Sequence, residues 1–267
     1  MTQVHSTAIV DPKAELASDV TVGPYSVVGP RVKLAAGVKL HSHVVLDGKT
    51  SVGERTEIYP FASIGQPPQD LKFRGEDSEL IVGSDNTIRE YVTMNSGTEG
   101  GGLVTKVGNG CAFLTGAHVG HDTIVGNNVV LSNNAMLAGH CVIEDFVIVS
   151  GGAGVHQFTR IGKHAFIGGM SGVENDIIPY GMALGNRARL AGLNIIGMRR
   201  RGFEREQIQE LRAAYRMLFA EEGTLRERIE DVASHFSGQA DVIDIIKFMK
   251  AETSRSICTP RNSAGEA

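Results

Sequence analysis

The sequence predicts a parallel β-helix followed by a helical region, and three observations support this fold class. First, an apolar residue recurs at every sixth position over 4–64, and the same period resumes over 82–94 and over 107–173. Second, a small or β-branched residue stands four positions after most of these sites, and glycine often follows them directly. Third, the six-residue period ends near Asn186, where a helical period replaces it. We therefore expect a mainly β protein with a C-terminal α-helical domain.

Each six-residue unit is interpreted as one short strand and one turn. A single unit cannot bury its apolar side chain, whereas stacked units form a continuous core. The period resembles that of hexapeptide-repeat proteins, in which three units make one triangular, left-handed coil. We expect the left-handed parallel β-helix to span residues 1–190 and the helical domain to span residues 191–267.

Two interruptions of the period predict loop insertions near residues 66–80 and 97–106. An insertion in a solenoid leaves the coil as a loop on one edge, which is often the binding face.

The helical tail has its own signals. Ile208, Leu211 and Leu218 form part of an apolar helical stripe, Thr224 with Glu227 predicts a capping box, and Asp241 is expected to cap a third helix. A bundle of this size is expected to pack on the β-helix or on neighbouring subunits.

Composition excludes several classes of protein. The formal net charge of -4 does not favour nucleic acid or an anionic membrane as a partner. The N-terminus lacks the basic and apolar regions of a signal peptide, and no apolar stretch approaches the ~18 residues of a membrane span. Three cysteines without metal-site spacing, Cys111, Cys141 and Cys258, predict reduced thiols, the first two in the core. We expect a cytoplasmic protein without a membrane span.

Several histidines converge when the coils are stacked. With three units per coil, residues 18 apart lie in one column, and neighbouring coils are about 4.8 Å apart. This arithmetic brings together one patch of polar side chains over three coils: His121, Asp122, His140, His156 and Gln157, with His118 near the preceding corner. Unrelated surface histidines would not converge in this way, so the patch is a candidate site.

Two kinds of chemistry suit the patch. A zinc site is one alternative, although the His118-x-x-His121 spacing differs from the spacing expected for the zinc-dependent carbonic anhydrases of this fold, and we expect no metal. The other is acyl transfer to a hydroxyl group, in which a neutral imidazole removes the hydroxyl proton. An adjacent carboxylate would orient that imidazole, and a backbone N–H at a glycine would stabilise the oxyanion.

Several motifs across the chain resemble those of one family, the UDP-N-acetylglucosamine O-acyltransferases that begin lipid A biosynthesis. They are Gly-Ala-His-Val-Gly-His-Asp (116–122), Leu-Ala-Gly-His (137–140), Val-His-Gln-Phe (155–158), Arg-Arg-Gly-Phe (200–203), Pro-Gln-Asp-Leu-Lys (68–72), Asn-Thr-Ile-Arg-Glu (86–90) and Gly-Gly-Met-Ser-Gly-Val (168–173). The resemblance covers essentially the whole chain. It implies transfer of an (R)-3-hydroxyacyl chain from acyl carrier protein to the 3-position of UDP-N-acetylglucosamine, with no further cofactor.

The resemblance also implies roles for individual residues. His121 would be the general base, Asp122 would support it, and Gly139 would supply the oxyanion N–H. The residues expected to contact the substrates are Gln69, Asp70, Lys72, His118, His140, His156, Gln157, Gly169, Asn194, Arg200 and Arg201. The family is a homotrimer with clefts between subunits, so these residues would come from two chains. The arginines at 199–201 would meet nucleotide phosphates or the acidic carrier protein.

The sequence departs from the family pattern at two positions. Ile196 stands where a glutamate is common near the uracil, and Arg187 replaces a histidine near the acyl groove. Gly169 matches the position that limits acyl length, and a glycine there predicts a long hydroxyacyl chain.

Other assignments remain as alternatives. The same chemistry on a 3-amino UDP-sugar would form an amide. The later lipid A N-acyltransferase shares fold and donor but usually carries an additional N-terminal domain, whereas here the units begin at Val4. Acetyl-coenzyme A-dependent enzymes of this fold are generally shorter and lack the 68–72 motif. A non-enzymatic scaffold gives no reason for the histidine patch.

Overall fold

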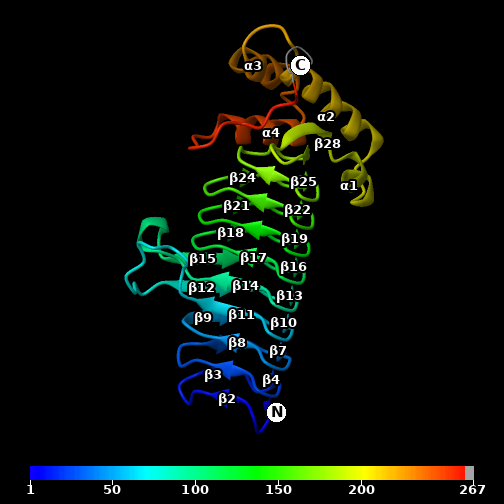
Figure 1. Ribbon diagram of the computed structural model, residues 1–267. Coiled ribbons are helices and arrows are strands. Elements are labelled where there is room, and N and C mark those ends of the chain that lie inside the picture. The colour runs from blue at the N-terminus through cyan, green and yellow to red at the C-terminus, as the bar shows by residue number, and fades with distance from the viewer. Residues whose placement is uncertain (262–267) are drawn as a thin grey trace.

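The structure is a computed structural model that describes residues 1–261, and it confirms the parallel β-helix. The chain winds round a three-sided coil, and successive strands enter three different sheets in turn. Figure 1 shows the coils stacked in one direction, with the N-terminus at one end and the helices at the other. Every neighbouring pair within the stack is parallel up to β27.

The first sheet has eleven strands. They are β1 (Gln3–Val4), β4 (Thr21–Val22), β7 (Lys39–Leu40), β10 (Glu57–Ile58), β13 (Thr87–Ile88), β16 (Ala112–Phe113), β19 (Val130–Leu131), β22 (Ile148–Val149), β25 (Phe166–Ile167), β27 (Gly181–Leu184) and β28 (Arg189–Leu193).

The second and third sheets complete the prism. The second contains β2 (Ile9–Val10), β5 (Val27–Val28), β8 (Val45–Leu46), β11 (Ser63–Gln66), β14 (Thr93–Asn95), β17 (His118–Val119), β20 (Met136–Leu137), β23 (Gly154–Val155) and β26 (Gly172–Val173). The third contains β3 (Glu15–Leu16), β6 (Lys33–Leu34), β9 (Lys49–Val52), β12 (Glu79–Val82), β15 (Val104–Val107), β18 (Ile124–Val125), β21 (Val142–Ile143) and β24 (Arg160–Ile161).

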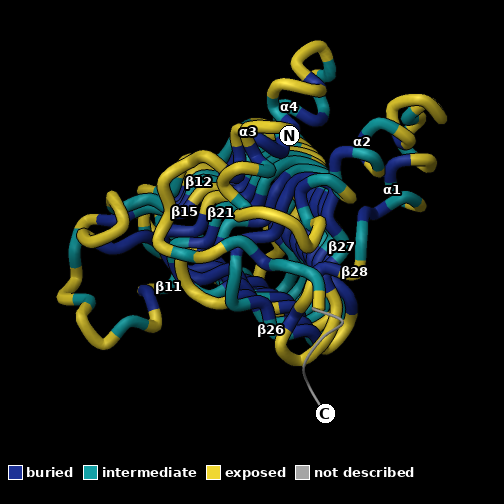
Figure 2. The backbone as a smooth tube through the Cα atoms, turned by 90° about the horizontal axis from the view of Figure 1, so that it is seen from above, coloured by how far each residue is buried: buried dark blue, intermediate teal, exposed yellow. Residues whose placement is uncertain are grey.

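The core is the interior of this prism. In most two-residue strands the second residue points inward, and Val22 pairs with Leu40, which pairs in turn with Ile58. All three side chains are buried, and so are the inward residues of the later coils, whereas Val4 in the first coil is 47% exposed. Figure 2 colours the buried segments of the stacked coils dark blue. Each buried aliphatic side chain contributes roughly 1.5–3 kcal/mol as an upper estimate, so many coils together stabilise the fold.

The corners of the coil contain more than glycine. Asp122, His140 and Phe158 form one corner column, and all three have positive φ angles, 58°, 61° and 65°. Non-glycine residues rarely adopt this left-handed conformation. Here the next coil holds each corner, because the backbone N–H of His140 donates to the carbonyl of His121 and that of Phe158 donates to the carbonyl of Gly139. The corner therefore places the Asp122 and His140 side chains rigidly.

Two loops leave the coil, between β11 and β12 (67–78) and between β14 and β15 (96–103), where they overlap the two period breaks. The inward residues still stack across them, since Ile64 pairs with Met94 and Met94 pairs with Val119. Figure 1 shows both loops projecting from the same side of the prism. The second loop contains a short 3₁₀ helix, η1 (Glu99–Gly101).

The C-terminal end differs in part from the expectation. The helical domain was expected to begin at residue 191, but Arg189–Leu193 form β28, which pairs antiparallel with β27 and closes the first sheet. The boundary proposed between residues 190 and 191 therefore falls inside a strand. The hairpin of β27 and β28 was not predicted, because the stretch that forms it is polar and contains glycine.

Four α-helices follow the hairpin. They are α1 (Ile195–Arg200), α2 (Arg205–Leu218), α3 (Leu225–His235) and α4 (Ala240–Lys250). The capping box of Thr224 and Glu227 is present, whereas the cap expected at Asp241 is wrong, because α4 begins after Gln239. Asp241 instead accepts a hydrogen bond from the hydroxyl of Tyr180, 2.9 Å away. Among the described residues, none of the helices has the length and apolar run that crossing a bilayer requires.

Candidate active site

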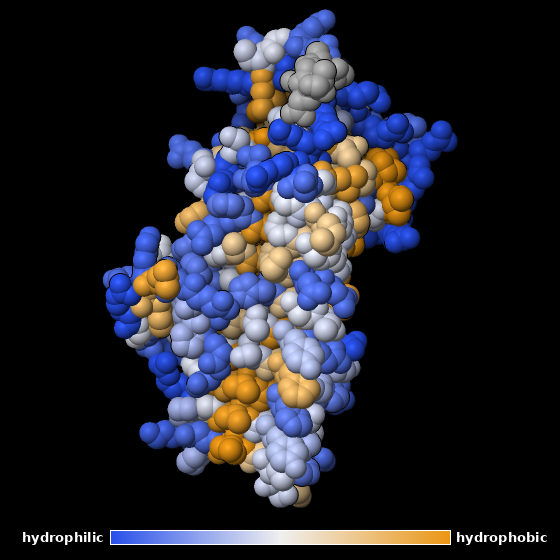
Figure 3. Space-filling view, viewed as in Figure 1, coloured by the Kyte–Doolittle hydropathy of each residue, from blue (hydrophilic) through white to orange (hydrophobic). Residues whose placement is uncertain are grey.

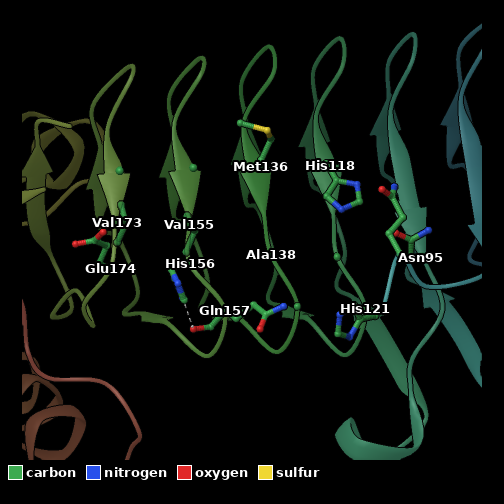
Figure 4. Close-up of a pocket in the computed structure, with 15 residues that line it drawn as sticks. Asn95, His118, His121, Met136, Ala138, Val155, His156, Gln157, Val173 and Glu174 are labelled. Atoms are coloured by element: carbon green, nitrogen blue, oxygen red, sulfur yellow. Dashed lines mark hydrogen bonds between the residues drawn. The ribbon is translucent and has the colours of Figure 1, made fainter. Parts of the chain in front are cut away.

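A groove of about 460 Å³ runs along the outer face of the second sheet, beside the corner that holds His121. It is lined by Gln69, Asn95, His118, Gly120, His121, Met136, Ala138, Gly139, Gly154, Val155, His156, Gln157, Gly172, Val173 and Glu174. Figure 4 shows His118 and His121 at one end of the groove and Glu174 at the other. The outward positions along its floor are Met136, Gly154 and Gly172, which are strand partners. The groove thus joins a histidine-rich end to an apolar, glycine-rich floor.

His121 and Asp122 form a hydrogen-bonded dyad at the histidine-rich end. Nδ1 of His121 lies 2.7 Å from Oδ2 of Asp122, whose side chain is fully buried. A carboxylate only accepts hydrogen bonds, so the imidazole carries its proton on Nδ1 and a lone pair on Nε2. This is the tautomer that a general base requires. Histidine also titrates near neutral pH, which suits it to proton transfer.

Gly139 lies against the ring of His121, one coil along. A methyl group built on Gly139 would lie 2.6 Å from Nε2 and 2.5 Å from Cε1 of His121. Only glycine leaves the ring this space. Within residues 1–261, the backbone N–H of Gly139 donates no hydrogen bond, so it is available to an acceptor in the groove.

Two further histidines surround the dyad. His118 shares a hydrogen bond of 2.7 Å between its Nδ1 and Oγ1 of Thr93, and burial lowers its pKa, with the nearby His121 adding to the effect. The His140 ring stands edge-on to His121 and stacks on Phe158, with ring centroids 4.9 and 4.4 Å apart respectively. Burial also lowers the pKa of His140, against the opposing charge of Asp122. Both rings therefore favour the neutral form at neutral pH.

His121, Asp122 and His140 are also the residues that could hold a metal, since their ligand atoms lie within 4.8 Å of one another. The hydrogen bonding disfavours this use, because Oδ2 of Asp122 already accepts the Nδ1 proton of His121. An ion between them would have to displace that proton. The arrangement fits a base and its orienting carboxylate better than a ligand set.

Comparison with known proteins supports an acyltransferase. A family profile described as Udp N-acetylglucosamine O-acyltransferase, Domain 2, matches residues 176–258. The acyl-[acyl-carrier-protein]–UDP-N-acetylglucosamine O-acyltransferase of Myxococcus xanthus is 50% identical over 250 residues, which cover 94% of this chain and 97% of that protein. The protein of the same name from Caulobacter vibrioides is 51% identical over 275 residues, covering 96% and 98% of the two chains. The chain belongs to the UDP-N-acetylglucosamine O-acyltransferase family.

Solved structures of this acyltransferase family agree with the fold. LpxA from Acinetobacter baumannii is 41% identical, with a TM-score of 0.89 over 96% of this chain and 99% of that one. The UDP-N-acetylglucosamine O-acyltransferase (LpxA) of Moraxella catarrhalis is 37% identical, with a TM-score of 0.92 and the same coverage. These matches confirm the predicted fold class, a left-handed parallel β-helix with a C-terminal helical region.

The predicted site residues lie in separate groups at different places on the chain. His118, His121, Gly139, His156, Gln157 and Gln69 line the groove, and Asp122 and His140 adjoin it. Asp70 and Lys72 lie on the first loop, where Oδ1 of Asp70 accepts a hydrogen bond from the backbone N–H of Lys72. Asp70 is close enough to His140 for its charge to raise the pKa of that ring against the lowering effect of burial.

A second group lies at a different corner of the coil. Asn194 caps α1, and its Nδ2 donates to the carbonyl of His164. The Arg201 guanidinium donates to the carbonyl of Phe146, which stacks with His164 in that corner column. Arg200, the last residue of α1, is exposed, as is Ile196.

Gly169 occupies yet another corner, next to Gly151 and at the opposite edge of the second sheet from His121. Arg187, the other departure from the family pattern, forms an ion pair with Glu174 at the far end of the groove. Neither Gly169 nor Arg187 lines the groove beside the dyad.

Three residues that sequence reasoning missed bear on the site. Asn95 lines the groove with a buried Oδ1 that has no partner in the described part of the chain, while its Nδ2 donates to the carbonyl of Pro67 in the first loop. Thr98 contacts Asp122, and Arg255 contacts His156. Asn95 just precedes the second break of the period and Thr98 lies within it, which was a usable signal. Nothing in the sequence places Arg255 beside the groove.

Proposed function

We propose that this chain transfers an (R)-3-hydroxyacyl group from acyl carrier protein to the 3-hydroxyl of UDP-N-acetylglucosamine, the first step of lipid A biosynthesis, with His121 as general base. Family membership supports the reaction class. The single observation that supports the base is the His121–Asp122 dyad, in which Nδ1 donates to a buried carboxylate and Nε2 is left to accept a proton at the groove.

The chemistry follows from that tautomer. Nε2 of His121 takes the proton of the sugar hydroxyl as its oxygen attacks the thioester carbonyl. The tetrahedral oxyanion accepts a hydrogen bond from the backbone N–H of Gly139. When the intermediate collapses, the C–S bond breaks and the thiolate of pantetheine takes the proton back from the imidazolium. Asp122 stabilises the imidazolium between these two steps.

The groove floor suits the acyl chain. Met136, Gly154 and Gly172 offer an apolar floor. The floor is open at Gly154, where a side chain would meet no atom of the described residues within 4 Å, whereas the carbonyl oxygen of Asn186 lies over Gly172, 2.7 Å from a methyl group built there. Methylene groups contribute roughly 0.8 kcal/mol each when buried, so a long chain gains most from such a floor. The donor brings its own pantetheine, and the proposed mechanism uses no other cofactor or metal.

The sugar nucleotide would contact Gln69, Asp70 and Lys72 of the first loop together with His140 and Gln157. We assign Asn194, Arg200 and Arg201 to its nucleotide, and their position at another corner of the coil supports a role in the groove of a neighbouring subunit. A homotrimer in the cytoplasm meets this requirement. The arginines of 199–201 also suit an acidic carrier protein.

The surface offers a face for such neighbours. Outward residues of β2 and β5 are apolar and exposed, with Ile9 68% and Val27 38% accessible. Figure 3 shows hydrophobic surface in the lower part of this view, over the N-terminal coils. Exposed apolar strips of this kind mark association surfaces.

An acylation assay tests the function. His121→Ala is expected to lower turnover roughly 10²–10⁴-fold, because a positioned base contributes that much. His5→Ala, at an exposed histidine of the first coil, serves as the control. Near-normal turnover of His121→Ala would reject the mechanism. Offering the 3-hydroxy and 3-amino UDP-sugars side by side decides between ester and amide formation. Both acceptors are tested because the exposed Ile196 lies near the proposed nucleotide contacts, at a position where the sequence departs from the family pattern.

A further inference from the structure

The carboxylate of Asp122 accepts more than the hydrogen bond from His121. The backbone N–H of Thr98 donates to Oδ1 at 2.7 Å, and the Thr98 hydroxyl donates to Oδ2 at 2.6 Å. Both residues are buried. Three donors therefore converge on one carboxylate, two of them from a single residue of the second loop. Hydrogen bonds to a charged group are shorter and stronger than neutral ones.

The second loop is shaped to make these contacts. The carbonyl of Thr98 accepts from the N–H groups of Gly101 and Leu103, 3.1 and 2.8 Å away, so the loop turns back on Thr98. Gly101 then packs on the carboxylate itself, because a methyl group built there would lie 2.0 Å from Cγ of Asp122. Any side chain at this position would push the loop off Asp122.

We propose that Thr98 is a positioning residue for acyl transfer, and that the second loop fixes the Asp122 carboxylate in the orientation that receives the Nδ1 proton of His121. The inference rests on the proposed function, in which His121 is the base. Without Thr98 the carboxylate can rotate away from His121, and the imidazole can adopt the tautomer whose Nε2 is protonated and cannot accept the sugar proton. Thr98 touches no reacting atom and acts through Asp122.

A pair of substitutions at Thr98 separates the effect of the hydroxyl group from any effect on the fold. Thr98→Val keeps the shape and the backbone N–H but removes the hydroxyl donor, whereas Thr98→Ser keeps the donor. Loss of one hydrogen bond to a charged group corresponds to roughly 10- to 100-fold. We expect Thr98→Val to lower kcat by that factor with KM within about twofold, and Thr98→Ser to recover most of the loss. A Thr98→Val enzyme with unchanged kcat overturns the proposal.

A double-mutant cycle tests whether Thr98 works through Asp122. In an Asp122→Asn background, adding Thr98→Val should lower kcat by no more than about twofold, because the ionised acceptor is already gone. Fully multiplicative losses would mean that Thr98 acts independently of Asp122. Nitrogen NMR of histidine-labelled protein supplies a second readout, since only a positioning role shifts His121 towards the other tautomer.

Gly101→Ala and Gly100→Ala form a matched pair in the same loop. A side chain at Gly100 meets none of the described atoms within 4 Å, so that variant should behave as the parent, whereas Gly101→Ala should lose kcat at least as strongly as Thr98→Val. Equal activity of the two variants contradicts the loop's role.

The His121→Ala assay distinguishes failure of the proposed function from failure of this inference. An active His121→Ala enzyme refutes the proposed function, whereas an inactive one alongside a fully active Thr98→Val enzyme refutes only this inference.

Discussion

Arg255 and His156 are 99 positions apart in the chain and are joined by a hydrogen bond of 2.5 Å from Nη2 of Arg255 to Nδ1 of His156. Nε of the same guanidinium donates to the carbonyl of Gln157 at 3.0 Å. The C-terminal segment reaches this place because it runs back along the last coils, where the N–H of Asp176 donates to the carbonyl of Ser256. Nδ1 of His156 also lies 3.3 Å from the carbonyl of Gln157, to which it could only donate. The contact with Arg255 is shorter and arginine can only donate, so His156 accepts on Nδ1 and presents an N–H from Nε2.

Removing this arginine is expected to weaken donor binding. In Arg255→Met, His156 can exchange tautomers and loses its fixed orientation at the groove. Loss of one polar contact of about 1 kcal/mol predicts a KM for the acyl carrier donor raised roughly fivefold, with a smaller change in kcat. Steady-state kinetics measure both constants. Arg226→Met, on the exposed side of α3, is the control, and an equal KM in the two variants would contradict the role of Arg255.

The positions of His121 and Arg255 show which parts of the site could be predicted from the sequence and which could not. His121 and Asp122 were predicted because each coil pairs with the next at a fixed step, so spacing alone gives spatial neighbours. Arg255 reaches the groove because the C-terminal segment runs back along the coils, and this segment has no repeat from which its neighbours could be predicted. The same reason hid β28, whose antiparallel pairing ends the repeat. The left-handed corners were not predicted either, since Asp122 has a φ of 58°, a conformation that non-glycine residues rarely adopt.

Substituting Gly139 tests the space under the catalytic ring. In Gly139→Ala the added methyl group would lie 2.6 Å from Nε2 of His121, so the ring must turn away from its place beside Asp122. We expect kcat to fall at least 100-fold, because the base is displaced and the oxyanion donor shifts with it. The control is Gly238→Ala, where a side chain meets no atom within 4 Å. A Gly139→Ala enzyme that retained parental turnover would place the base elsewhere.

Acyl chain length is expected to depend on Gly169. This residue is exposed beside Gly151, and the absence of a side chain leaves the corner open to a long chain. We predict that the parent prefers hydroxyacyl donors longer than ten carbons and that Gly169→Met shifts the preference towards shorter ones. A panel of acyl carrier substrates of graded length measures both. A parent enzyme that favours the ten-carbon donor makes the prediction wrong.

His164 should make the protein sensitive to acid. Its ring is stacked between Phe146 and Tyr180, and its buried Nδ1 has no hydrogen-bond partner among residues 1–261. Burial together with the charges of Arg201 and Lys163 lowers its pKa to about 4. The folded protein therefore takes up this proton only near pH 4, whereas the unfolded chain takes it up near the ordinary value of 6.5. Stability is lost as pH falls through this window.

Replacing the ring removes this loss. His164→Phe keeps the stack, and Phe146 already adopts the same left-handed corner conformation. Between pH 6.5 and pH 5 the parent should lose at most about 2 kcal/mol more stability than the variant. Urea unfolding at the two pH values measures the difference. Identical pH dependence of parent and variant would contradict the low pKa of His164.

The ion pair of Arg160 and Asp176 should hold the helical region on the last coils. Nε of Arg160 lies 2.8 Å from Oδ2 of the fully buried Asp176, and the same guanidinium donates to the carbonyl of Phe248 in α4 and lies over its ring. Removing one partner of a buried pair leaves an uncompensated charge, which costs several kcal/mol. We expect Arg160→Met to lower the free energy of unfolding by about 3 kcal/mol in urea.

Two further variants separate the buried charge from the general loss of a cation. Lys250→Met removes a cation from an exposed pair with Glu230 and should cost less than about 1 kcal/mol. Adding Asp176→Asn to Arg160→Met neutralises the stranded carboxylate and should restore part of the lost stability. If Arg160→Met and Lys250→Met cost the same, the pair does not anchor α4. If the double variant is no more stable than Arg160→Met, the loss comes from the contacts with Phe248 and not from the buried charge.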